Sequence, residues 1–318
     1  MDLLLDNPIA SMDGAAFLLL FIVFIVITVA VLAVAKATID STDRMPIPAI
    51  PPQVDPFEIS YLRGGANELA RSVVFSLVQK GFVQMANDGK DGRLRRIDSG
   101  AEPNSLSEIE QLALRWVGSE RDAKDVFDTT SGLIATMESR SARYELELSR
   151  RQFLMPEEWK GRMKKYGLAA ALAIAGVGGF KMVAAIMTGR FNILFAIFLT
   201  IVGFVIARGI GKLPRVTKLG NQYLARLQSA FEGLKYQTPQ MLNPQAGSVG
   251  VDPLLLSVGV FGTGILAGTA FSNYNDTFAR QHQAGTSCGS ACGSGCGSSG
   301  GSGDGGGGSC GGGCGGCS

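Results

Sequence analysis

The side chains with the richest chemistry in this 318-residue chain are thiols, and all of them lie near the C-terminal end. The six cysteines are Cys288, Cys292, Cys296, Cys310, Cys314 and Cys317, and the only histidine, His282, lies just before them. Clustered thiolates in a flexible chain can bind a soft metal such as zinc or Cu(I), with the histidine as an extra donor. Their spacing matches no zinc finger, and the same thiols could pair as disulfides or receive a covalent modification. A low-complexity tail without dedicated chemistry is the fourth interpretation that the sequence leaves open.

The segment that carries these thiols cannot build a packed core around them. Residues 285–318 comprise 17 Gly, 8 Ser, 6 Cys and three other residues. This composition buries too little apolar surface to offset the entropy lost on folding. We therefore expect residues 285–318 to form a disordered tail.

The first 280 residues, which contain neither cysteine nor histidine, show no catalytic constellation. Glu157 and Glu158 are adjacent at the start of an expected helix, where carboxylates suit the helix dipole but do not converge on one substrate. Gly209, Gly211 and Lys212 lack the spacing of a phosphate-binding loop. The sequence therefore predicts a binding or structural protein rather than an enzyme.

Composition and hydropathy indicate that the main partner of the chain is a lipid bilayer. Apolar residues make up 46% of the chain and charged residues 18%, with a mean hydropathy of +0.21, unlike a typical soluble domain. Residues 15–35 are free of charge and long enough to cross a hydrocarbon core of about 30 Å, and the acidic leader 1–14 does not resemble a signal peptide. Residues 167–187 and 191–207 predict a hairpin of two further transmembrane helices. Residues 254–271 are a fourth, weaker candidate.

The distribution of Lys and Arg predicts the orientation, because basic residues are retained on the cytoplasmic side. Lys and Arg lie at those ends of the apolar runs that border residues 36–166 and residues 208–253. These two segments are therefore expected inside. The N-terminus 1–14 is expected outside, and so is the tail if 254–271 crosses the bilayer. Small residues four apart in the hairpin favour close helix packing and a homo-oligomer: Ala171, Ala175, Gly179, Gly203 and Ala207.

One charge, Lys181, interrupts the second apolar run. An ionisable group within a span is a candidate for an ion pathway. Lys181 lies six residues from the end of the expected helix, however, so its long side chain can carry the ammonium to the outer interface. We favour this second interpretation.

The part between the first and second apolar runs predicts a small cytoplasmic module. Residues 44–56 hold five prolines and form a semi-rigid linker. Residues 57–155 then predict two helices, a β-hairpin and a third helix that starts at a capping box of Ser105 and Glu108. This order resembles a winged helix. The expected fold is thus mainly α, a multi-pass membrane protein of three or four transmembrane helices with an α+β winged-helix-like module.

Winged helices that bind DNA use basic residues on the wing, and Arg93, Arg95 and Arg96 would fit this role. Residues 36–166 contain 20 basic and 20 acidic residues, however, and the whole chain has a net charge of only +2. We therefore expect a protein partner at the module rather than a nucleic acid. The segment 208–253 includes an amphipathic helix that either lies on the inner leaflet or packs on the module.

Several of these features occur together in a family of uncharacterised bacterial membrane proteins that the chain resembles. They are the stretch from Asp55 to Leu94 (DPFEISYLRGG to DGRL), the helical hairpin, the DPLLL segment and the Gly/Cys tail. The most specific are the turn Leu62–Gly65, the DPLLL segment and the tail. The resemblance implies the bacterial inner membrane and carries over no catalytic residue. A membrane-tethered DNA-binding regulator and a metal-handling protein that uses the cysteine tail are the alternatives.

Overall fold

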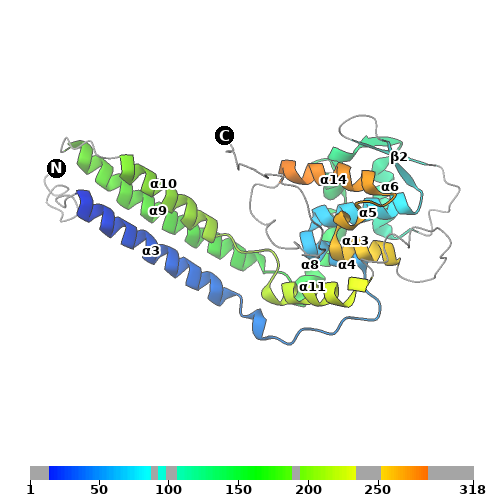
Figure 1. Ribbon diagram of the computed structural model, residues 1–318, viewed down its shortest axis with the longest axis horizontal. Coiled ribbons are helices and arrows are strands. Elements are labelled where there is room, and N and C mark those ends of the chain that lie inside the picture. The colour runs from blue at the N-terminus through cyan, green and yellow to red at the C-terminus, as the bar shows by residue number, and fades with distance from the viewer. Residues whose placement is uncertain (1–13, 87–91, 98–105, 188–193, 234–251, 286–318) are drawn as a thin grey trace, which may run out of the picture.

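The computed structural model describes residues 14–86, 92–97, 106–187, 194–233 and 252–285, in which an elongated arm of helices projects from a rounder body (Figure 1). The arm consists of α3 (Gly14–Ile39), α9 (Glu157–Met187) and α10 (Leu194–Ile210). The helices α3 and α9 include the first two predicted apolar runs, and α10 includes residues 194–207 of the third. Among the described residues, α3 and α9 are long and apolar enough to cross a membrane, and α10 is a shorter apolar helix of 17 residues.

Small side chains bring the backbones of α9 and α10 together. A Cβ atom added to Gly167 would lie 2.7 Å from the Cα atom of Gly211, closer than real Cβ contacts allow. Ala171, Gly203 and Ala207 are buried in the same interface. Three of the small residues that were expected at a homo-oligomer interface thus pack helices of one chain against each other. The homo-oligomer stays a prediction.

The body begins with α4 (Pro56–Gly64) and α5 (Ala66–Gln79). The Asp55 carboxylate caps α4 by accepting a hydrogen bond from the Phe57 N–H at 2.8 Å, as predicted.

The helix α6 (Glu108–Val117) starts two residues later than expected. Its capping box is formed by Ser107, whose N–H donates to Glu110 at 2.8 Å, so the prediction of Ser105 and Glu108 is wrong.

The body contains one antiparallel sheet of three short strands, β1 (Val83–Ala86), β2 (Arg93–Arg96) and β3 (Glu120–Asp122). Their spatial order is β1-β2-β3. The register pairs Val83 with Arg96 and Arg95 with Glu120. The β1–β2 hairpin is confirmed. The strand β3 was not expected, because its three residues are all charged and lack the alternation of apolar residues that indicates a strand.

The remaining body helices are η3 (Ala123–Phe127), α7 (Leu133–Thr136), α8 (Glu138–Arg150) and α11 (Lys218–Ala230). Leu219, Tyr223 and Leu227 of α11 are buried in the body core. Of the two locations considered for the amphipathic helix of the segment 208–253, the structure therefore selects packing on the body.

The expected transmembrane helix over residues 254–271 is wrong. The segment forms the nine-residue α13 (Pro253–Phe261) and η4 (Thr263–Leu266), followed by α14 (Ser272–Gly285). A helix of nine residues spans about 14 Å, half of a hydrocarbon core. Its apolar side chains, together with Tyr274 and Phe278 of α14, are buried in the body core against α4 and α5. Hydropathy alone does not separate a buried core helix from a span.

A cluster of buried charges joins the turn between α4 and α5 to α13. The Glu68 carboxylate forms ion pairs with both Arg63 and Arg71, and its side chain is only 12% exposed. Arg63 Nη1 also donates to the Val258 carbonyl of α13 at 3.1 Å. Burial lowers the pKa of Arg63, and the charge of Glu68 opposes this effect.

Neutralising Glu68 should therefore destabilise the body. Glu68→Gln leaves two buried guanidinium groups without their carboxylate, a loss of about 3–5 kcal/mol in the free energy of unfolding. We expect a clearly lower Tm of the full chain in detergent. Glu120→Gln is the matched control, because its partners Arg93 and Arg95 are exposed and solvent screens such pairs. Equal Tm values for the two variants would contradict the role of the buried cluster.

The packing of the arm gives a second prediction. Gly167→Ala places a methyl group against the Gly211 backbone and should lower the Tm, because α9 and α10 must separate. Gly176→Ala on the same helix meets no atom within 4 Å, so it should leave the Tm unchanged or raise it through the better helix propensity of alanine. A thermal scan of both variants in detergent distinguishes the two outcomes.

Candidate functional site

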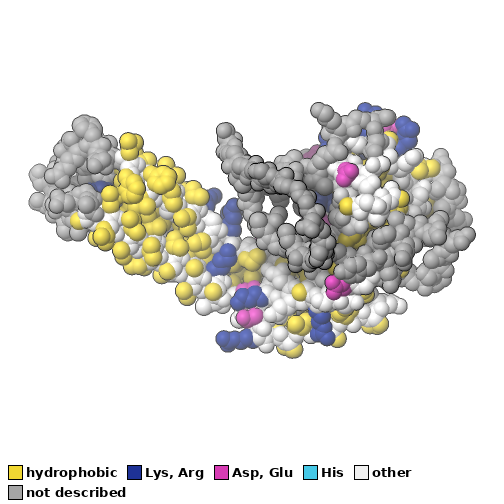
Figure 2. Space-filling model, viewed as in Figure 1, with side chains coloured by type: hydrophobic (Ala, Val, Ile, Leu, Met, Phe, Trp, Pro, Cys, Tyr) yellow, Lys and Arg dark blue, Asp and Glu magenta, His cyan; other side chains and the backbone are white. Residues whose placement is uncertain are grey.

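The surface of the arm is the largest unusual feature of the structure. Figure 2 shows apolar side chains over most of the visible face of the arm. Over the whole arm, eleven aliphatic or Phe side chains are each at least 58% exposed: Leu19, Val26, Ile27, Val31, Val34, Leu172, Val183, Leu194, Phe198, Ile201 and Val205. Soluble monomers rarely expose apolar patches larger than a few hundred Å². The arm therefore presents an apolar surface of the kind that a lipid bilayer or a protein partner covers.

This apolar surface ends abruptly near the body, where Figure 2 shows Lys and Arg side chains. Five exposed basic residues lie here, Arg162, Lys164 and Lys165 on α9 with Arg208 and Lys212 at the end of α10, and we call them the basic collar. Two exposed aromatic residues, Trp159 and Tyr166, lie on the same part of α9. Aromatic rings and basic side chains at the end of an apolar helix are typical of a membrane–water interface.

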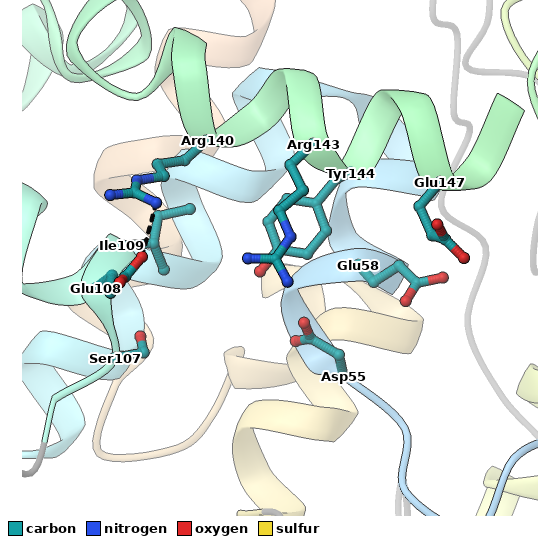
Figure 3. Close-up of a pocket in the computed structure, with 9 residues that line it drawn as sticks. All are labelled: Asp55, Glu58, Ser107, Glu108, Ile109, Arg140, Arg143, Tyr144 and Glu147. Carbon is teal, nitrogen blue, oxygen red and sulfur yellow. Dashed lines mark ion pairs between the residues drawn. The ribbon is translucent and has the colours of Figure 1, made fainter.

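On the body, a pocket of 460 Å³ lies between the N-terminal ends of α4 and α6 and one face of α8 (Figure 3). Its lining is Asp55, Glu58, Ser107, Glu108, Ile109, Arg140, Arg143, Tyr144 and Glu147. An ion pair of 2.7 Å between Arg140 and Glu108 closes one end. Arg151 pairs with Glu58 and with Glu147, each at 3.1 Å, at the other end. The pocket thus carries charges of both signs.

Two titratable groups of the pocket, Glu58 and Tyr144, have raised pKa values. Burial raises the pKa of Glu58, Arg151 opposes this shift, and the neighbouring Asp55 and Glu147 carboxylates add to it. Burial and the Asp55 carboxylate raise the pKa of Tyr144, so its phenol stays protonated near neutral pH. The described part of the chain contains no group of three or more residues suited to hold a metal ion. The pocket offers polar and charged contacts for a binding partner.

The structure gives the arginines of the predicted wing acidic partners. Arg93 pairs with Glu120 at 3.2 Å and with Asp122 at 3.6 Å, and Arg95 pairs with Glu120 at 3.3 Å. Hydrogen bonds from Arg93 and Arg95 lower the pKa of Glu120, which therefore stays charged. Two of the three arginines that would contact DNA are thus paired with acidic residues of β3, a strand that the sequence did not reveal.

The other residues singled out in the sequence lie apart from one another. The Lys181 ammonium lies 5.1 Å from the centre of the Phe17 ring in α3, and neither its interfacial nor its ion-pathway interpretation is tested by this contact. Glu157 pairs with Lys160 at 2.6 Å. The six cysteines, the predicted ligands of zinc or copper, lie outside the described residues. Their metal, disulfide and modification chemistries stay predictions.

Comparisons with protein-family models, with curated proteins and with solved structures found no match. The resemblance to bacterial membrane proteins and to winged helices therefore stays a prediction. The function has to be argued from the arm, the basic collar and the pocket.

The pairing of the wing arginines predicts weak interaction with DNA. The full chain in detergent should show no sequence-selective shift of duplex DNA at physiological salt, because Glu120 and Asp122 compete with phosphates for Arg93 and Arg95. Removing these acids with Glu120→Gln and Asp122→Asn should raise the non-specific affinity and its dependence on salt. Selective and salt-sensitive binding by the unchanged protein would instead support the regulator hypothesis.

Proposed function

We propose that the chain is a multi-pass protein of the bacterial inner membrane, anchored by α3, α9 and α10, whose body acts as a binding or structural module in the cytoplasm. The observation that carries this proposal is the exposed apolar surface of the arm, which ends at the basic collar. In a bilayer this surface contacts acyl chains, and the basic collar lies in the cytoplasmic headgroup region, as basic residues prefer.

Three spans place the N-terminus outside and the body inside. The chain leaves the body through α14, whose Tyr274 and Phe278 are buried in the body core. The tail then begins on the cytoplasmic side, opposite to the side that a fourth span over residues 254–271 would give. Thiols in the cytoplasm are kept reduced. This location favours metal binding or modification of the six cysteines over structural disulfides.

The body is proposed to bind a protein rather than a nucleic acid. Two features support this proposal: the paired arginines of the wing and the pocket with charges of both signs between α4, α6 and α8. The ion pairs at the two ends of the pocket suit a polar peptide. Phosphate groups would instead be repelled by the carboxylates of Glu58, Glu108 and Glu147. Metal handling by the tail is the second candidate, favoured by its location in a reducing compartment.

The native cysteines provide a direct test of the topology, because every thiol lies in the tail. In intact cells the unmodified protein should resist a membrane-impermeant maleimide, and it should react fully after the inner membrane is permeabilised. The protein should also stay in the membrane fraction after alkaline carbonate extraction.

A control variant reports on the other side of the membrane. With the six cysteines changed to serine and Asp6→Cys added, the N-terminal thiol should be labelled in intact cells. Rapid labelling of the native tail in intact cells would place it outside and contradict the three-span topology.

A further inference from the structure

The five residues of the basic collar share one level of the arm. The backbone at Gly211 lies close to Met163 and Gly167 of α9. A Cβ atom added to Gly211 would lie 2.7 Å from the Gly167 Cα atom and 3.3 Å from the Met163 carbonyl oxygen. Arg162, Lys164 and Lys165 lie within a turn and a half of this contact on α9. Arg208 and Lys212 flank it on the other helix. Segments almost fifty residues apart in the sequence therefore contribute to one basic band.

The boundary between apolar and basic surface is sharp on both helices. On α9 the exposed Tyr166 is followed directly by the apolar positions Leu168 and Leu172. On α10 the exposed Val205 and Ile206 are followed by Arg208. One helix turn thus separates side chains suited to acyl chains from side chains suited to anions.

Carboxylates of the protein do not neutralise this band. Within the described parts of the chain, none of the five residues of the basic collar forms an ion pair with Asp or Glu. Two of the nearby acids have other partners: Glu157 pairs with Lys160, and Asp43 pairs with Lys218. Asp40 accepts a hydrogen bond from the Lys218 N–H at 2.8 Å. The basic collar therefore keeps its positive charge available at the surface.

We propose that the basic collar binds the anionic headgroups of the phospholipids in the leaflet next to the body. This inference rests on the proposed membrane insertion and names the lipid class that the inserted protein selects. A phosphodiester with a net negative charge satisfies the lysines and arginines, whereas the cationic group of a zwitterionic headgroup is repelled. The attraction is electrostatic and falls with salt.

Trp159 provides the measurement, because it belongs to the same segment of α9 as the basic collar. The chain has two tryptophans, and Trp116→Phe leaves Trp159 as the only one. The full chain carrying this change is reconstituted in mixed vesicles, in which either phosphatidylglycerol or phosphatidylcholine bears brominated acyl chains that quench tryptophan fluorescence. The ratio of the two quenching efficiencies gives the enrichment of anionic lipid near Trp159.

We expect the anionic lipid to be enriched several-fold, and we expect this enrichment to fall towards one in the variant Lys164→Gln, Lys165→Gln and Arg208→Gln. Arg162 is kept, because its guanidinium lies 5.3 Å from the centre of the Trp159 ring and its loss would alter the fluorescence. The matched control removes three exposed charges from the body, Arg96→Gln, Arg115→Gln and Arg150→Gln, and should keep the full enrichment.

Each outcome decides between the hypotheses. An absence of quenching by either brominated lipid would overturn the membrane insertion itself. Equal quenching by both lipids would leave the insertion intact and overturn the lipid selectivity. Enrichment that survives in the collar variant would assign the selectivity to other residues and also overturn the proposal. Should the collar variant fail to fold, a salt titration of the parent protein decides, since enrichment that is unchanged between low and high salt contradicts binding by charge.

Discussion

The turn Leu62–Gly65 between α4 and α5 holds three distant parts of the chain together through two arginines. Arg215, which lies between the arm and α11, donates from Nη1 to the carbonyls of Tyr61 and Leu62 at 2.8 and 3.0 Å. Gly65 has a φ of 74°, a backbone conformation that residues with a side chain rarely adopt. Arg63 of the turn reaches the Val258 carbonyl of α13. The turn therefore contributes hydrogen bonds both to the link with the arm and to the C-terminal helices.

A second contact fixes the arm to the body from the other side. Asp40 at the end of α3 accepts a hydrogen bond from the Lys218 N–H, and Thr42 Oγ1 accepts one from the Leu219 N–H at 3.2 Å. These are the backbone groups that the first turn of α11 leaves without helical partners. Residues that directly follow α3 therefore complete the capping of a body helix, so that α3 is coupled to the body despite the extended, proline-rich linker that separates them in sequence.

The sequence predicted those features that depend on local patterns and missed those that depend on distant contacts. Long apolar runs located α3, α9 and α10, and the Asp55–Pro56 start of α4 followed from local capping rules. The strand β3 and the burial of residues 254–271 could not be predicted from local patterns. The charged side chains of β3 and the apolar side chains of α13 both contact residues that are distant in the sequence. The pocket was missed for the same reason, because its charges come from three separate helices.

The order of the chain has a consequence for synthesis. The core of the body spans residues 54 to 278, yet α9 and α10 are inserted between its two halves. Tyr274 donates to the carbonyl of Arg71, 203 residues earlier, at 2.5 Å. At about 5–20 residues per second a ribosome needs roughly 10–40 s to cover this distance. The part of α5 that α13 and Tyr274 cover stays open until then, so the helices of the arm leave the ribosome before the domain that they carry can close.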